Sequence, residues 1–79
     1  MSGKSVTVYD EVVRLARQYF GAESARHVSK TIGIHLRKPP EEMTKDDLIS
    51  LIDWIKSAVS FIEEDKILAD KYINDLLSL

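Results

Sequence analysis

The chain contains no cysteine, and only three glycines and two prolines occur among its 79 residues. Without cysteine there is no disulfide framework, no thiolate nucleophile and no zinc site built on sulfur. A cysteine-free composition is consistent with a reducing compartment. These absences exclude the disulfide-rich secreted domains and the sulfur-ligated zinc modules.

Long apolar runs are also missing. The longest apolar stretch, residues 48–62, is interrupted by Asp53 and Lys56 and is shorter than the ~18–20 residues that a bilayer span needs. The first five residues contain no apolar region of the kind found in signal peptides. We therefore expect a cytoplasmic protein with no membrane-spanning segment.

Helical periodicity is what the sequence does contain. A length of 79 residues, with 44% hydrophobic and 30% charged residues, is typical of one small globular domain. Apolar residues recur at intervals of three and four in four segments. We predict an all-α fold, a small four-helix bundle with helices at about residues 8–20, 23–37, 45–62 and 65–78. Residues 1–7 are expected to form a partly disordered N-terminal arm before a single helical domain at 8–79, and the β-branched segment 5–8 is consistent with either an extended or a helical state.

Two helix starts carry capping boxes, in which a Thr side chain and an acid three residues later satisfy backbone N–H groups of the first turn. The first box is Thr7 with Asp10, and the second is Thr44 with Asp47. The second is reinforced by Met43 and Leu48, which flank it as a hydrophobic staple. Gly21 is expected at the C′ position of the first helix, because glycine adopts a left-handed conformation without a Cβ clash.

Other helix boundaries follow from the prolines and from charge. Pro39 and Pro40 should end the second helix, and a close helix crossing or a bend would explain Gly33 in its interior. A single helix over residues 45–78 would be about 51 Å long. We therefore predict a break near 63–65 with Asp65 capping the fourth helix, whereas a continuous helix would indicate a dimeric coiled coil.

The small size of the core favours self-association, since below ~80 residues a single core rarely supplies more than a few kcal/mol. On the third helix the apolar residues cover roughly 180°, which is wider than the stripe a one-sided helix needs. Trp54 and Phe61 lie at the edge of this stripe, beside Ala58. Either the two aromatic residues are buried within the monomer, or the three form a self-association surface, most simply that of a homodimer.

Charge is divided between the two halves of the chain. Residues 1–40 have a net charge of +4, and residues 41–79 have a net charge of −6. Arg26, Lys30 and Arg37 should form a basic face on the second helix, opposite its core side. This face is an ordinary solvated face, or it attracts the acidic half of the chain within the bundle or across a dimer, or it is a site for an acidic protein partner. Nucleic acid is disfavoured, because the pI is about 5.6 and few base-reading side chains accompany the arginines.

His27 is the only residue with a motif of catalytic interest. The segment from His27 to Thr31 resembles the phospho-acceptor helix of sensor histidine kinases in its histidine, its basic residue at +3 and its threonine at +4. Val28 stands where that family has an acidic residue, and Ile32 stands where it has proline, so the carboxylate that assists proton removal is missing. From the residues alone, His27 is expected to pair with Glu23 one turn earlier.

No other pattern indicates catalysis or a cofactor. His35 is expected to be a packed histidine with one hydrogen bond, and the two histidines do not converge on one metal ion. The sequence therefore predicts no enzyme, cofactor or metal site. It predicts a non-enzymatic protein–protein interaction or dimerisation module, with or without a regulatory role. The alternatives are a small helix-turn-helix-like nucleic-acid-binding domain that uses the basic face and, with less support, a histidine phosphotransfer module at His27.

Overall fold

The computed structural model of the chain describes residues 6–79. In these residues it contains four α-helices and one short 3₁₀ turn: α1 (Val8–Phe20), α2 (Ala22–His35), η1 (Pro40–Glu42), α3 (Lys45–Ile62) and α4 (Lys66–Leu77). The all-α fold and the four-helix bundle are confirmed. The predicted arm at 1–7 falls largely outside the described residues. At its end, Thr7 is extended and Val8 is already helical.

The first helix begins at the predicted capping box. The Thr7 Oγ1 accepts a hydrogen bond of 3.1 Å from the Asp10 N–H, and the Asp10 carboxylate accepts one of 3.3 Å from the Thr7 N–H. Two backbone donors of the first turn are thereby satisfied. The same reciprocal bonds join Thr44 and Asp47 at the start of α3, so both predicted boxes are confirmed.

Gly21 alone connects α1 to α2. It is the C-cap of the first helix and the N-cap of the second, with φ 99° and ψ 173°. Glycine was expected here as a left-handed C′ residue. The positive φ is present, but the ψ places the residue in an extended conformation that is essentially restricted to glycine. This conformation lets the chain reverse direction within one residue.

Helix α2 ends at His35, two residues before the expected end at Arg37. Leu36 donates the last helical hydrogen bond, to the Ile32 carbonyl, and is itself extended, with φ −80° and ψ 126°. The chain therefore leaves the helix before Lys38, the residue that Pro39 disfavours in the helical region. Of the two expected reasons for Gly33, the close helix crossing is wrong, because a Cβ at this position would meet no atom of another part of the chain within 4 Å. No helix crosses closely at that position.

The break between α3 and α4 is confirmed. Helix α3 ends at Ile62, and Asp65 caps α4 by accepting hydrogen bonds from the N–H groups of Ile67 and Leu68 at 3.0 and 3.3 Å. The alternative of one continuous helix over residues 45–78 is therefore wrong. The two helices fold back on each other within one chain.

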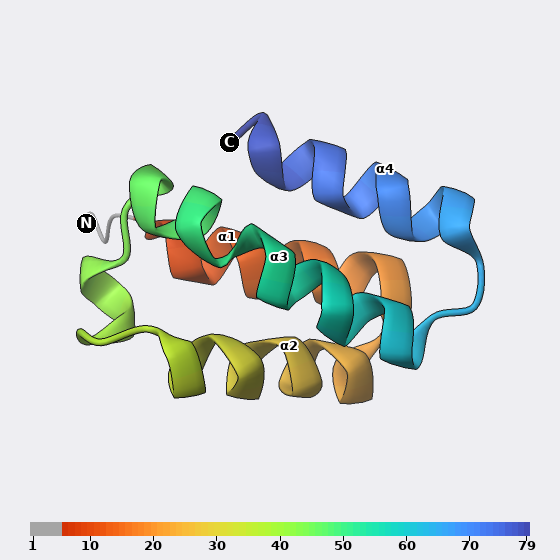
Figure 1. Cartoon of the computed structure of the whole chain (residues 1–79), viewed down its shortest axis with the longest axis horizontal. Coiled ribbons are helices and arrows are strands. Elements are labelled where there is room, and N and C mark those ends of the chain that lie inside the picture. Colours follow the sequence, from red (N-terminus) through yellow and green to blue (C-terminus); the bar gives the residue numbers. More distant parts are fainter. Residues whose placement is uncertain (1–5) are drawn as a thin grey trace.

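The four helices lie alongside one another around one core (Figure 1). Figure 1 shows α3 lying in front of α1, with α2 along one side of this pair and α4 along the other. Helices α1 and α3 each pack against both α2 and α4. Consecutive helices run antiparallel, as their short connections require (Figure 1).

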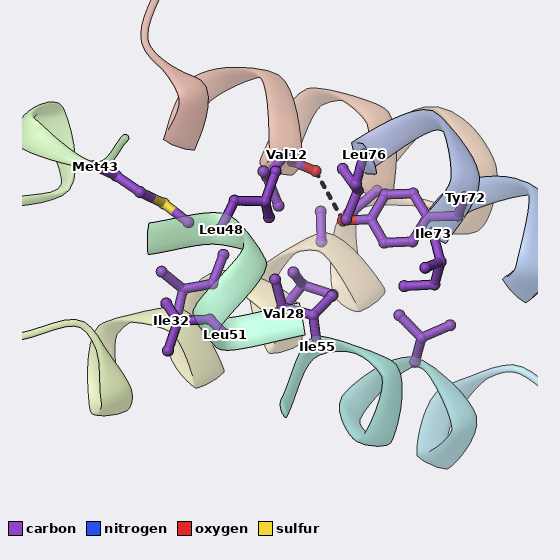
Figure 2. Packing of buried hydrophobic residues seen from close by; sticks show 13 residues of the cluster. Val12, Val28, Ile32, Met43, Leu48, Leu51, Ile55, Tyr72, Ile73 and Leu76 are labelled. Carbon is purple, nitrogen blue, oxygen red and sulfur yellow. Dashed lines mark hydrogen bonds between the residues drawn. The ribbon is translucent and has the colours of Figure 1, made fainter. Parts of the chain in front are cut away.

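The core lies between all four helices and is apolar except for one hydroxyl. Tyr72 is fully buried, and its hydroxyl donates a 2.9 Å hydrogen bond to the carbonyl of Val12 (Figure 2). Burial raises the pKa of Tyr72, so this donor stays protonated. Met43 and Leu48, the predicted staple, belong to the same cluster. The buried members of the cluster are Val12, Ala16, Ala25, Val28, Ile32, Met43, Leu48, Leu51, Ile55, Val59, Tyr72, Ile73 and Leu76.

Candidate interaction surface

One flank of α3 carries two aromatic side chains that the bundle leaves exposed. Trp54 is 52% exposed and Phe61 is 83% exposed, although both continue the apolar stripe of the helix. Ala58, between them along the chain, is buried. Of the two arrangements that the sequence allowed, the structure has both aromatic residues on the surface. Ala58 contributes almost no exposed area to it.

Each of these aromatic rings stacks on a histidine of α2. The ring centroids of His27 and Phe61 are 5.9 Å apart with 27° between their planes, and those of His35 and Trp54 are 3.9 Å apart with 14° between their planes. The histidines are eight residues apart and the aromatic residues seven, which corresponds to about 12 and 10.5 Å along a helix. The rises match, so both pairs form along the line where the antiparallel helices α2 and α3 meet.

A third apolar side chain extends this exposed area. Ile34 is 67% exposed, and it follows His27 by seven residues, so it has nearly the same angular position on α2. We name the five residues together the α2–α3 surface: His27, Ile34, His35, Trp54 and Phe61. It combines three exposed apolar side chains with two imidazoles, on two helices that the core holds in place.

The environments of the two histidines differ from those expected. Glu23, the expected partner of His27, instead has its carboxylate 3.8 Å from Arg26. His35 packs, as expected, but through ring stacking on Trp54. The sequence contained a signal for these pairs in the matching intervals of eight and seven residues. That signal could be used only once α2 and α3 were known to be antiparallel neighbours.

The predicted basic face is only partly helical. Arg26 and Lys30 are exposed on α2, but Arg37 lies beyond the end of that helix, so the three residues do not form one continuous helical stripe. Lys30 follows His27 by three residues and therefore lies about 60° further round α2, away from α3. We call Arg26, Lys30 and Arg37 the basic margin of the surface.

An acidic margin lies on the opposite side. Asp46 and Asp53 are exposed on α3, about 80° and 100° round the helix from Trp54, on the side away from α2. Within residues 6–79 no ion pair involves Lys30, Asp46 or Asp53. Glu23 is also exposed on the basic side of α2, about 40° from His27, and its carboxylate lies 3.8 Å from Arg26. The α2–α3 surface thus has an apolar, aromatic centre, an edge of net positive charge and a negative edge.

An ion pair connects the segment after α2 to the start of α3 at one end of the surface. The Lys38 ammonium lies 2.9 Å from the Asp47 carboxylate, which joins the segment after α2 to the first turn of α3. Hydrogen bonding to the Thr44 backbone, and secondly to Lys38, lowers the pKa of Asp47. The carboxylate that completes the capping box is therefore also the one that ties α3 to the chain following α2.

Other kinds of site are not evident in the described part of the chain. Across residues 6–79 no three His, Cys, Asp or Glu side chains gather as a metal site would require, and no pocket opens on the surface. None of the four helices has the length and apolar character needed to cross a membrane. No family model matches the chain, and neither a curated protein nor a solved structure resembles it significantly.

Proposed function

We propose that this protein is a non-enzymatic helical module that binds another protein through the α2–α3 surface. The observation that carries the proposal is the exposure of Trp54 and Phe61, two turns apart on the same flank of α3. Large exposed apolar patches on soluble domains mark interaction sites. Tryptophan in particular is enriched among the residues that contribute most binding energy at interfaces.

The stacked histidines make this surface suited to binding. Ordering a mobile side chain on association costs about 0.5–1.5 kcal/mol. The stack of Trp54 on His35 restricts the tryptophan ring before any partner arrives. Phe61 keeps most of its area open despite its stack on His27, so it remains available for a partner.

The two charged margins favour a protein over a nucleic acid as the partner. A duplex presents a uniformly negative backbone, which Arg26 and Lys30 would attract. Asp46 and Asp53 border the same surface and would repel it. A protein can present charges of both signs, and such complementarity at the rim favours the correct orientation of binding.

Site-specific photo-cross-linking in the native cell tests this function. The photoreactive residue p-benzoylphenylalanine replaces Phe61 in one variant and Ile67 in a matched control. Ile67 is also an exposed apolar residue, at 71%, but it lies on α4, away from the surface. We expect a discrete protein adduct from position 61 and none from position 67. No adduct at position 61, or the same adducts at both positions, would contradict the proposal.

A further inference from the structure

We infer that the partner of the α2–α3 surface is a second copy of this chain, related by a two-fold axis parallel to α2 and α3. This inference rests on the proposed function, since it names the occupant of the same surface. In this arrangement α2 of each copy lies opposite α3 of the other. Symmetric dimers of this kind are the commonest protein oligomers.

Charge selects this orientation of the axis. With the axis parallel to the helices, the basic margin of each copy faces the acidic margin of the other. With the axis perpendicular to the helices within the interface, α2 would face α2 and α3 would face α3. The basic margin of each copy would then lie on the same side as the basic margin of the other, and the acidic margins would likewise coincide, and like charges across an interface oppose association.

The charges of the two margins are spread along the helices. A two-fold axis parallel to the helices keeps each residue at its own height along them. Arg37 and Asp46 are each next to a member of the Lys38–Asp47 ion pair, so both lie toward that end of the surface. Lys30 is one turn from the His27–Phe61 pair and Asp53 is adjacent to Trp54, so these two lie roughly 8 Å apart along the helices. The attraction therefore acts between whole margins and not within one matched ion pair.

The same two-fold rotation also brings the aromatic residues of the two copies into contact. The pair of His27 and Phe61 of one copy meets the same pair of the other, and the pair of His35 and Trp54 does likewise. Each exposed ring of α3 is thereby placed against α2 of the other copy, where Ile34 is exposed. The apolar centre of one copy's α2–α3 surface therefore covers that of the other copy, and the charged margins lie at the rim of the interface.

Sedimentation equilibrium of the purified full chain, from about 1 μM to 1 mM, tests for the second copy. We expect a reversible monomer–dimer equilibrium. Trp54→Ala and Phe61→Ala should each raise the dissociation constant at least about tenfold, as truncation of a central aromatic residue does. Ile67→Ala should leave it unchanged, and circular dichroism melts establish that each variant is folded. A wild-type chain that stays monomeric to 1 mM would overturn the inference.

A charge exchange tests the direction of the axis. Lys30→Glu with Arg37→Glu should raise the dissociation constant about tenfold at low salt, and less at high salt, because each reversed charge then faces an acidic margin. Adding Asp46→Lys and Asp53→Lys to the same chain should restore dimerisation, since opposite charges again face each other. If the exchange fails to restore a dimer whose variants remain folded, the axis is not the one inferred.

The two proposals fail in different ways. If cross-linking at position 61 yields an adduct with another protein while the purified chain is monomeric, the second copy is wrong and the interaction function stands. If position 61 yields no adduct and the chain is monomeric, both are wrong. An adduct of twice the chain's mass together with a dimer in sedimentation supports both.

Discussion

Gly21 and Gly33 form a natural comparison, because a Cβ at either position would meet no atom within 4 Å. Any difference between Ala substitutions therefore comes from backbone conformation. Gly21 has a positive φ in a region essentially restricted to glycine, whereas Gly33 lies within α2. The first glycine is needed for the reversal between α1 and α2, and the second is not needed for any contact that the structure shows.

Opposite stability changes are therefore expected for these two substitutions. Gly21→Ala should lower the free energy of unfolding by about 1–3 kcal/mol, the usual cost of a strained backbone residue. Gly33→Ala should raise it by about 0.5–1 kcal/mol, the helix preference of alanine over glycine. Urea denaturation followed by circular dichroism measures both. A loss of stability for Gly33→Ala would show that the position has a structural role after all.

Among the helices, the start of α4 depends most directly on one side chain. Asp65 accepts hydrogen bonds from two N–H groups of the first turn, and the chain reverses just before it. Asp65→Ala should lower the free energy of unfolding by about 1 kcal/mol, which is typical for loss of an N-cap. Glu64→Ala, at the adjacent exposed position, is the matched control and should change it little. A rise in stability and helix content for Asp65→Ala would instead indicate that α3 and α4 tend to join.

The start of α3 should be sensitive to acid through Asp47. Its pKa is lowered from the ordinary value of 3.8 by the backbone of Thr44 and then by Lys38. A lowered pKa in the folded state means that the ionised carboxylate stabilises the fold above its unfolded pKa, and that this contribution is lost as the pH falls through the folded pKa. The stability difference between the wild type and Asp47→Asn should therefore be largest near neutral pH and shrink below about pH 4.

Urea denaturation at a series of pH values measures this difference. Asp70→Asn provides a matched control, because Asp70 is an exposed carboxylate in α4. The difference between the wild type and this control should be small throughout the series. A difference for Asp47→Asn that stays constant down to strongly acid pH would show that the ionised carboxylate stabilises the fold no more than its protonated form does, and would contradict the prediction.

For the molecule as a whole, the sequence predicted what local chemistry determines. The capping boxes at Thr7 and Thr44 and the cap at Asp65 depend on side chains within three residues of the backbone groups they bond. Such contacts form wherever the helix forms, so the starts of α1, α3 and α4 were placed to within one residue. The end of α2 was displaced by two residues because Pro39 and Pro40 only set a limit beyond which the helix cannot continue, and the chain already becomes extended at Leu36.

The α2–α3 surface was less accessible to prediction from the sequence. The width of the apolar stripe on α3 showed that Trp54 and Phe61 were at its edge, but not whether a neighbour covered them. That depended on where α2 packs, and on which of its residues face α3. The stacks with His27 and His35 are contacts between helices, and no local pattern specifies them.

The dependence of the melting temperature on protein concentration tests whether the whole molecule binds a second copy. If a second copy binds only the folded chain, dissociation accompanies unfolding, and the melting temperature must rise with protein concentration. With an unfolding enthalpy of about 0.7 kcal/mol per residue, a hundredfold increase in concentration above the dissociation constant should raise the Tm by roughly 5–10 °C. Phe61→Ala should flatten this dependence, whereas Ile67→Ala should preserve it, because only the first alters the α2–α3 surface. A wild-type Tm that does not change with concentration would mean that the folded chain gains no stability from a second copy, and the aromatic surface would then have to serve a different protein.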